Sequence, residues 1–141
     1  YKRLFGGGEG ELTILDEDNI LESDIQITAK PPGKKMKNLN LLSGGEKALT
    51  AISILFAIIL AKPTPFCILD EIEAPLDDAN IFRFGEYLKE LSEDTQFIAV
   101  THRRGTMEAA DYIYGVTMEK KAISKVIGLD LHEAHKMTDI I

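Results

Sequence analysis

The sequence has 141 residues, of which 45% are hydrophobic and 28% are charged, and this composition is typical of one globular domain. This composition excludes a disordered tail and a collagen-like fibre. A disulfide-stapled miniprotein is excluded as well, because Cys67 is the only cysteine. A single cysteine favours a reducing, intracellular setting, and we expect no signal peptide. The 16 basic and 23 acidic side chains give a net charge of −7, which limits any contact with DNA to a local patch.

The first forty residues predict two strands separated by loops. Four glycines at positions 6–8 and 10 predict that residues 1–10 form a linker or turn. Alternating and β-branched residues predict strands over Glu11–Leu15 and Asp24–Ala29. The segment Lys30–Lys37 contains Pro-Pro-Gly and four lysines. We interpret it as a solvated loop in preference to a phosphate-contacting patch.

A long apolar helix is predicted to begin after Ser43. The spacing of Ser43 and Glu46, just before an apolar run, fits a capping box. Twelve of the fourteen residues Ala48–Ala61 are apolar, so we expect this helix to be buried on most sides and to end near Pro63. The run is shorter than the ~20 residues that span a bilayer, which favours a core helix.

The next segment predicts a strand–helix–strand unit. The apolar run Phe66–Leu69 stops at two acidic residues and predicts a central strand buried on both faces. Asp77 offers an N-cap for an amphipathic helix over residues 78–93. A second apolar strand follows over Gln96–Val100. The length of the crossover makes the two strands parallel.

The end of the sequence predicts a short helix over Thr106–Ala110 and a strand pair over Tyr112–Met118 and Ala122–Ile127. Residues 129–141 are interpreted as a tail. His132 and His135 lie three residues apart rather than four, so a surface tail is favoured over a metal site. Together these elements predict an α/β fold with a largely parallel core sheet, flanking helices and an antiparallel strand pair.

Chemically useful side chains follow both strands of the predicted unit. Parallel strands bring Asp70, Glu71 and His102 to one carboxyl-terminal sheet edge, where α/β proteins bind ligands. One carboxylate could hold a hydrated magnesium ion, the next could deprotonate a water, and the imidazole could contact a phosphate oxygen. Taken singly, an acidic pair that caps a turn and a structural histidine are the favoured interpretations. Because all three side chains are expected at one edge, a functional site becomes the more favoured interpretation.

The start of the apolar helix offers a second anion site, while a nucleotide cradle is missing. Backbone amides at Ser43-Gly44-Gly45 point outward, and the helix dipole is positive there. Taken alone, this feature is better explained by an ordinary capped helix. The sequence contains no G-x-x-x-x-G-K-[ST] phosphate loop. It therefore combines a hydrolytic edge with no primary phosphate pocket.

Three ordered motifs resemble one protein family. LLSGGEKALTAISILFAI is similar to an ABC-type signature motif, FCILDEIEAPLDDAN to a Walker B strand with its D-loop, and VTHRRGTMEAADYIYGVTM to a switch-histidine region. With LFGGGEGEL and the PPGKK loop, they resemble the C-terminal head segment of structural maintenance of chromosomes (SMC) proteins, of the bacterial type, over roughly residues 4–131. The resemblance implies a C-terminal lobe of an ABC-ATPase head, whose Walker A motif lies in the N-terminal lobe.

The resemblance implies a role for each motif residue. Asp70 would support Mg²⁺, usually through water, Glu71 would be the general base, and His102 would sense the γ-phosphate. The D-loop would be Ala74–Asp77, with Asp77 reaching across a head–head interface. The nucleotide-binding residues Ser43, Gly44, Gly45 and Glu46 would act on ATP bound by the opposite head. Glu73 stands where the family often has aspartate, and no role is assigned to it.

The resemblance also implies cofactors, partners and a place in the cell. ATP and Mg²⁺ would bind once the N-terminal lobe of the same protein is present, and this chain alone would be inactive. Further partners would be a second SMC head, a kleisin subunit and DNA, with no membrane, in the cytoplasm at the nucleoid. The strands of residues 112–127 and the tail are the expected kleisin surface. A related coiled-coil DNA-repair ATPase and a nucleotide-free kleisin-docking module are the alternatives.

Overall fold

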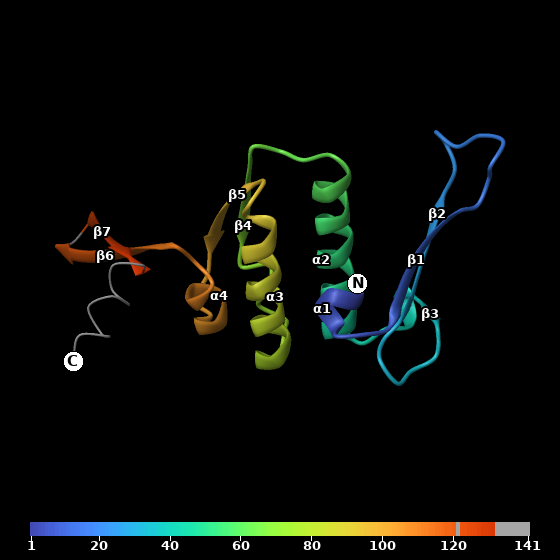
Figure 1. Cartoon of the computed structure of the whole chain (residues 1–141), viewed down its shortest axis with the longest axis horizontal. Coiled ribbons are helices and arrows are strands. Elements are labelled where there is room, and N and C mark those ends of the chain that lie inside the picture. Colours follow the sequence, from blue (N-terminus) through green and yellow to red (C-terminus); the bar gives the residue numbers. More distant parts are fainter. Residues whose placement is uncertain (121, 132–141) are drawn as a thin grey trace.

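The computed structural model describes residues 1–120 and 122–131, and within them helices and strands alternate as the sequence predicts. The elements are α1 (Lys2–Phe5), β1 (Glu9–Ile14), β2 (Ile25–Lys30), β3 (Lys37–Asn38), the 3₁₀ turn Leu39–Leu41, α2 (Gly44–Ala61), β4 (Phe66–Asp70), α3 (Asp78–Leu91), β5 (Gln96–Val100), α4 (Arg104–Glu108), β6 (Tyr112–Lys120) and β7 (Ile123–Asp130). The α/β class is confirmed. Figure 1 shows α2 and α3 in the middle, with β1–β3 on the α2 side and β6–β7 on the opposite side.

The N-terminal segment is more ordered than a linker. Residues 1–10, expected to be a linker or turn, contain α1 and the start of β1, and Leu4 is buried in the core. The glycines follow the helix: Gly6 ends it in the left-handed conformation, where a side chain is strained. The two predicted strands are confirmed as the antiparallel pair β1–β2, which β3 extends into a three-stranded sheet.

The apolar helix begins as predicted but is buried on one side only. Its inner face packs into the core, whereas Ile58 and Leu60 are 60% and 56% exposed. The expectation of burial on most sides is therefore wrong. Among the described residues, α1, the 3₁₀ turn and the core residues pack against one side of α2 and leave the other side exposed. With 18 residues and a mean hydropathy of 1.6, α2 has a length and composition that would also suit a membrane span.

The strand–helix–strand unit is confirmed. Strands β4 and β5 pair in parallel, with Asp70 opposite Val100 at the carboxyl-terminal end. Asp77 caps α3 by accepting a hydrogen bond from the Asn80 amide at 2.9 Å. The expectation that β4 is buried on both faces is wrong, since Phe66 and Ile68 are 55% and 61% exposed while Leu69 on the other face is buried.

The core lies where α2, α3 and the inner face of β4 and β5 meet. The Phe56 ring of α2 stacks on Phe84 of α3 with centroids 5.8 Å apart and meets the edge of Phe97 on β5 at 6.4 Å. Burying each such ring contributes roughly 2 kcal/mol or more. This aromatic cluster fixes the helices against the strands and thereby holds the strand ends in place.

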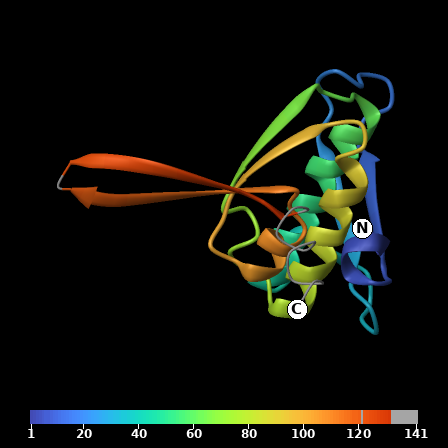
Figure 2. The same cartoon turned by 60° about the vertical axis from the view of Figure 1, so that its left-hand side comes forward.

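Strands β6 and β7 form an antiparallel hairpin that extends away from the rest of the chain (Figure 2). The predicted strand pair is confirmed, although β7 continues to Asp130, into the segment expected to be a tail. Apolar side chains remain exposed on it, among them Tyr114 at 69% and Val116 at 72%. His132 and His135 lie outside the described residues.

Candidate functional site

The predicted hydrolytic residues meet at the carboxyl-terminal edge of the β4–β5 pair. Asp70 ends β4, Glu71 follows it, and His102 lies two residues beyond β5. The His102 Nδ1 atom lies 3.2 Å from Glu71 Oε1, within hydrogen-bonding distance. Their side chains are 65% and 54% exposed, so both remain open to a ligand and to water. The prediction that these groups share one edge is confirmed by this geometry.

Glu71 has an unusual backbone conformation. Its φ is +48°, in the left-handed region that glutamate seldom adopts. The surrounding hydrogen bonds hold it there: its amide donates to the Val100 carbonyl at 2.9 Å, and its carbonyl accepts from the Ala74 amide at 3.0 Å. Strain of this kind concentrates at functional sites, where neighbouring structure fixes it. The turn therefore holds Glu71 in a strained backbone conformation, and this strain lowers the stability of the fold.

The start of α2 has the predicted capping box. The Glu46 carboxylate accepts from the Ser43 amide at 2.9 Å and from its hydroxyl at 2.8 Å, while the Ser43 Oγ accepts from the Glu46 amide. Lys34 adds a bond to Glu46 at 2.8 Å, so the predicted solvated loop is tied to the helix. Lys34 and Ser43 lower the pKa of Glu46 from 4.5 to about 2.

The two glycines at the start of α2 have no packing reason inside this chain. A side chain at Gly44 would meet no atom within 4 Å, and one at Gly45 would make ordinary contact with the Pro75 carbonyl at 3.6 Å. Glycine is less favourable than alanine in a helix by about 1 kcal/mol. The proximity of Gly45 and Pro75 also places the start of α2 beside the turn that follows Glu71, at the lower end of the molecule in Figure 1.

The remaining predicted site residues are separate from one another. Asp70 is exposed at the end of β4, and Asp77 is exposed while capping α3. Within residues 1–120 and 122–131, no three His, Cys, Asp or Glu side chains are grouped to hold a metal. The adjacent Asp70 and Glu71 carboxylates are the hard oxygen ligands that Mg²⁺ accepts, but a complete shell would need water and phosphate oxygens as well.

One important residue was not predicted. Glu73 is only 2% exposed, and its Oε1 accepts hydrogen bonds from the hydroxyls of Thr101 and Thr106. It links the turn after β4 to the turn after β5. The sequence does show an acidic residue close to Asp70 and Glu71, and a threonine on each side of His102 that could bond to this acidic residue. Linear spacing alone did not pair them.

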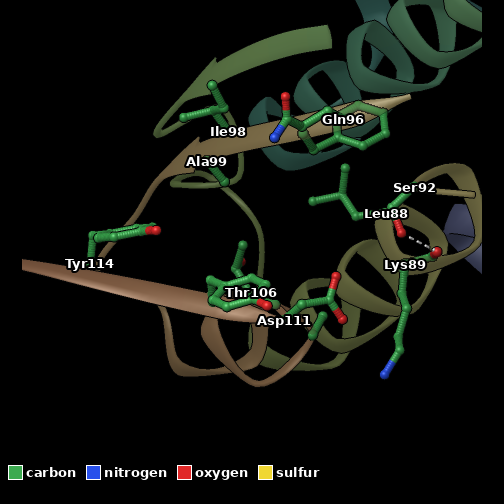
Figure 3. A pocket seen from close by; sticks show the side chains of 13 residues that line it. Leu88, Lys89, Ser92, Gln96, Ile98, Ala99, Thr106, Asp111 and Tyr114 are labelled. Atoms are coloured by element: carbon green, nitrogen blue, oxygen red, sulfur yellow. Dashed lines mark hydrogen bonds between the residues drawn. The ribbon is translucent and has the colours of Figure 1, made fainter. Parts of the chain in front are cut away.

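A groove of about 260 Å³ lies beside β5. Side chains from α3, β5, α4 and the beginning of β6 line it, among them Leu88, Ile98, Thr106 and Tyr114 (Figure 3). Within the described residues, β5 pairs with β4 alone, so its other edge has no strand neighbour. Backbone donors and acceptors on such an edge can pair with a further strand.

The fold, together with the Glu71–His102 pair at the carboxyl-terminal edge of β4 and β5, defines an α/β lobe with ATPase-type motifs. Residues 7–125 match the family described as RecF/RecN/SMC N terminal domain, and the chain belongs to this family. It is 59% identical over 133 residues to the Chromosome partition protein Smc of Bacillus subtilis, covering 94% of this chain and 11% of that protein. The chain thus spans about a tenth of the length of the curated relatives that it matches.

Solved structures agree with this assignment. The Smc head domain with an extended coiled coil from Pyrococcus furiosus, bound to the C-terminal domain of ScpA, superposes with a TM-score of 0.89 at 43% identity, over 98% of this chain and 34% of that one. A structure described as "Structural biochemistry of ATP-driven dimerization and DNA stimulated activation of SMC ATPases" gives 0.82 at 42% identity, over 98% and 83%. The resemblance to SMC heads is confirmed.

Proposed function

We propose that this chain is the C-terminal lobe of an SMC head that hydrolyses ATP in the whole protein to drive chromosome organisation, condensation and segregation. The observation that carries the proposal is the pairing of Glu71 and His102, 3.2 Å apart at the carboxyl-terminal edge of a parallel strand pair. The start of α2 lies at the same end of the molecule. Similarity to chromosome partition proteins gives the cellular role.

The edge residues divide the hydrolytic chemistry. Glu71 is the general base that takes a proton from the attacking water, and its exposed carboxylate is accessible to that water. His102 contacts Glu71 and contributes a hydrogen bond toward the γ-phosphate. Asp70, exposed at the end of β4, would help to hold a bound Mg²⁺ ion. Bound Mg²⁺ would neutralise developing phosphate charge, as it does in other nucleotide hydrolases.

The start of α2 acts on the ATP of a second head. Ser43 and Glu46 fix the first turn of the helix, whose amides and positive dipole end suit a phosphate. Gly44 and Gly45 allow a close approach that the fold of this chain does not itself require. Asp77 lies two residues after Pro75, whose carbonyl is close to Gly45, in the turn expected to cross the head–head interface. Two heads therefore complete each site.

The N-terminal lobe of the same protein completes the phosphate cradle. This chain contains no phosphate loop, and the free edge of β5 with its groove offers a place for a further strand (Figure 3). Exposed apolar residues on β4, including Phe66 and Ile68, indicate a surface made for burial. The lobe alone is accordingly inactive, and ATP with Mg²⁺ binds to the assembled head.

A kleisin subunit binds the β6–β7 hairpin, and DNA contacts form in the full complex in the bacterial cytoplasm. Apolar side chains of β6 and β7 are exposed on a hairpin that extends outward, which suits a protein partner. The Pyrococcus head in the comparison is bound to ScpA. The structure of that complex makes the kleisin proposal specific enough to test by pulldown.

The experiment is a Glu71→Gln substitution in the full-length protein. We expect ATP binding to persist and turnover to fall at least 100-fold, because the amide cannot accept the proton from water. Engaged head dimers should accumulate with ATP. Glu86→Gln, which changes an exposed carboxylate on α3, is the control. Turnover near the unsubstituted rate in Glu71→Gln would exclude Glu71 as the base.

A further inference from the structure

A buried carboxylate, Glu73, is hydrogen-bonded to the segment that carries His102 and follows Glu71 in the chain. Glu73 is 2% exposed and stands two residues after Glu71 in the turn that follows β4. A charged side chain is seldom this buried unless it has partners, since desolvation of an unpaired carboxylate is costly. Among the described residues Glu73 makes no ion pair, so hydroxyl groups satisfy it.

The partners of Glu73 come from the segment that carries His102. Thr101 precedes His102 and donates its hydroxyl hydrogen to Glu73 Oε1. Thr106, on α4, donates to the same oxygen at 3.1 Å and is itself 4% exposed. The Thr101 Oγ1 also accepts from the Arg103 amide at 3.0 Å. One carboxylate oxygen thus fixes the chain on both sides of His102.

The exposed pair needs such support. Solvent-exposed charged pairs gain little free energy, typically ~0.2–1 kcal/mol, so the contact between His102 and Glu71 cannot hold either side chain in place. Buried hydrogen bonds are stronger in their low-dielectric surroundings and leave an unsatisfied group when broken. The buried cluster is the stronger link between the two turns.

We propose that Glu73 is a positioning residue for ATP hydrolysis, which holds the His102 turn against the Glu71 turn through Thr101 and Thr106. This inference rests on the proposed function of Glu71. It assigns to the cluster an effect on the chemical step, separate from its contribution to folding. A merely structural cluster would alter stability and leave turnover of the folded protein unchanged.

The test compares two buried threonines in the full-length protein. Thr106→Val removes one hydroxyl of the cluster. The control, Thr95→Val, removes a hydroxyl of similar burial from the residue just before β5. Thr95 is 3% exposed, and its hydroxyl donates to the Thr64 carbonyl at 3.0 Å. Both substitutions should lower the melting temperature by similar amounts. We expect only Thr106→Val to lower kcat, by about tenfold, with the KM for ATP unchanged within twofold.

Substitutions at Glu73 provide a second measurement. Glu73→Gln keeps an acceptor oxygen for both hydroxyls and should retain most of kcat, whereas Glu73→Ala should lose about tenfold or more. Hydrogen exchange of residues 101–107 should quicken in Glu73→Ala and Thr106→Val but not in Thr95→Val. Should Glu73→Ala fail to fold, the threonine pair decides the matter.

The outcomes separate this inference from the proposed function. If Glu71→Gln stalls hydrolysis while Thr106→Val and Glu73→Ala keep the kcat of Thr95→Val, the positioning role is overturned and the base assignment stands. If Glu71→Gln retains turnover, the proposed function itself fails. A drop in kcat confined to the cluster variants, with Glu73→Gln restoring it, supports the inference.

Discussion

Glu71 combines an exposed carboxylate with a backbone that is costly for any residue carrying a Cβ atom. A left-handed φ costs an L-residue about 1–2 kcal/mol. Here the amide bond to Val100 and the turn to Ala74 maintain a φ of +48°. A glycine would relieve the strain, so the presence of glutamate indicates that its side chain matters more than local stability.

Removing the Glu71 carboxylate should abolish activity, and relieving the backbone strain at the same position should raise stability. Glu71→Ala and Glu71→Gly both remove the carboxylate and should both abolish turnover. Glu71→Gly should be the more stable of the two by about 0.5–1 kcal/mol, because relief of strain exceeds the extra entropy of glycine in the unfolded chain. Thermal unfolding of the two proteins measures the difference. Equal stability would contradict the claim of strain.

A control for this prediction exists at a second left-handed residue. Ala122, with φ of +64°, lies between β6 and β7, in the hairpin that extends away from the rest of the chain (Figure 2). Ala122→Gly relieves the same kind of strain and should leave ATP turnover unchanged. A loss of turnover there would mean that glycine substitutions disturb the head generally.

Features that depend on residues close together in the sequence could be predicted from it. The capping box of Ser43 and Glu46 and the N-cap Asp77 depend on residues three apart, and both are present. Glu73 depends on hydroxyl groups 28 and 33 positions away. No local rule pairs such residues, so its partners emerged only from the fold.

At the scale of elements, α2 and the lysine loop before it form one electrostatic unit. Lys34 is the largest cause of the lowered pKa of Glu46, followed by the Ser43 amide and hydroxyl. A pKa lowered on folding stabilises the fold above the unfolded value of 4.5. That stabilisation is lost as the pH falls from 4.5 toward about 2.

We therefore predict that Lys34→Met weakens this dependence. The pKa of Glu46 should rise toward its ordinary value, and stability at pH 7 should fall by about 0.5 kcal/mol, since Lys34 is largely exposed. The loss of stability between pH 4.5 and 2 should become shallower. Unfolding midpoints of the head across this range measure both effects. Lys35→Met, which breaks no ion pair among the described residues, is the control.

Element positions were predictable, but their burial was not. Periodicity and end signals located α2, β4, α3 and β5 to within two residues, because caps and prolines act locally. Apolar composition then predicted burial of both faces of β4 and most of α2, and half of each is exposed. Composition reports the surface that a sequence is suited to bury and does not report which chain covers it.

At the scale of the whole molecule, the exposed surfaces and the missing phosphate loop have one explanation. The free edge of β5, the outer face of β4 and the outer residues of α2 are all apolar or unpaired. The proposed hydrolytic edge brings Glu71 and His102 together, and the sequence contains no phosphate loop to hold the β- and γ-phosphates. A second lobe that adds a strand beside β5 would cover the exposed surfaces and would also provide the phosphate loop.

This explanation predicts how nucleotide binding depends on the two lobes. Calorimetric titration of this chain with Mg-ATP should give no binding, because the sequence contains no phosphate loop to hold the β- and γ-phosphates. Adding the N-terminal lobe should produce binding of one ATP per assembled head. The same titration with Glu71→Gln should bind equally well, since the base acts after binding. Tight binding by this chain alone would mean that its own residues form a phosphate cradle, and the two-lobe explanation would then be wrong.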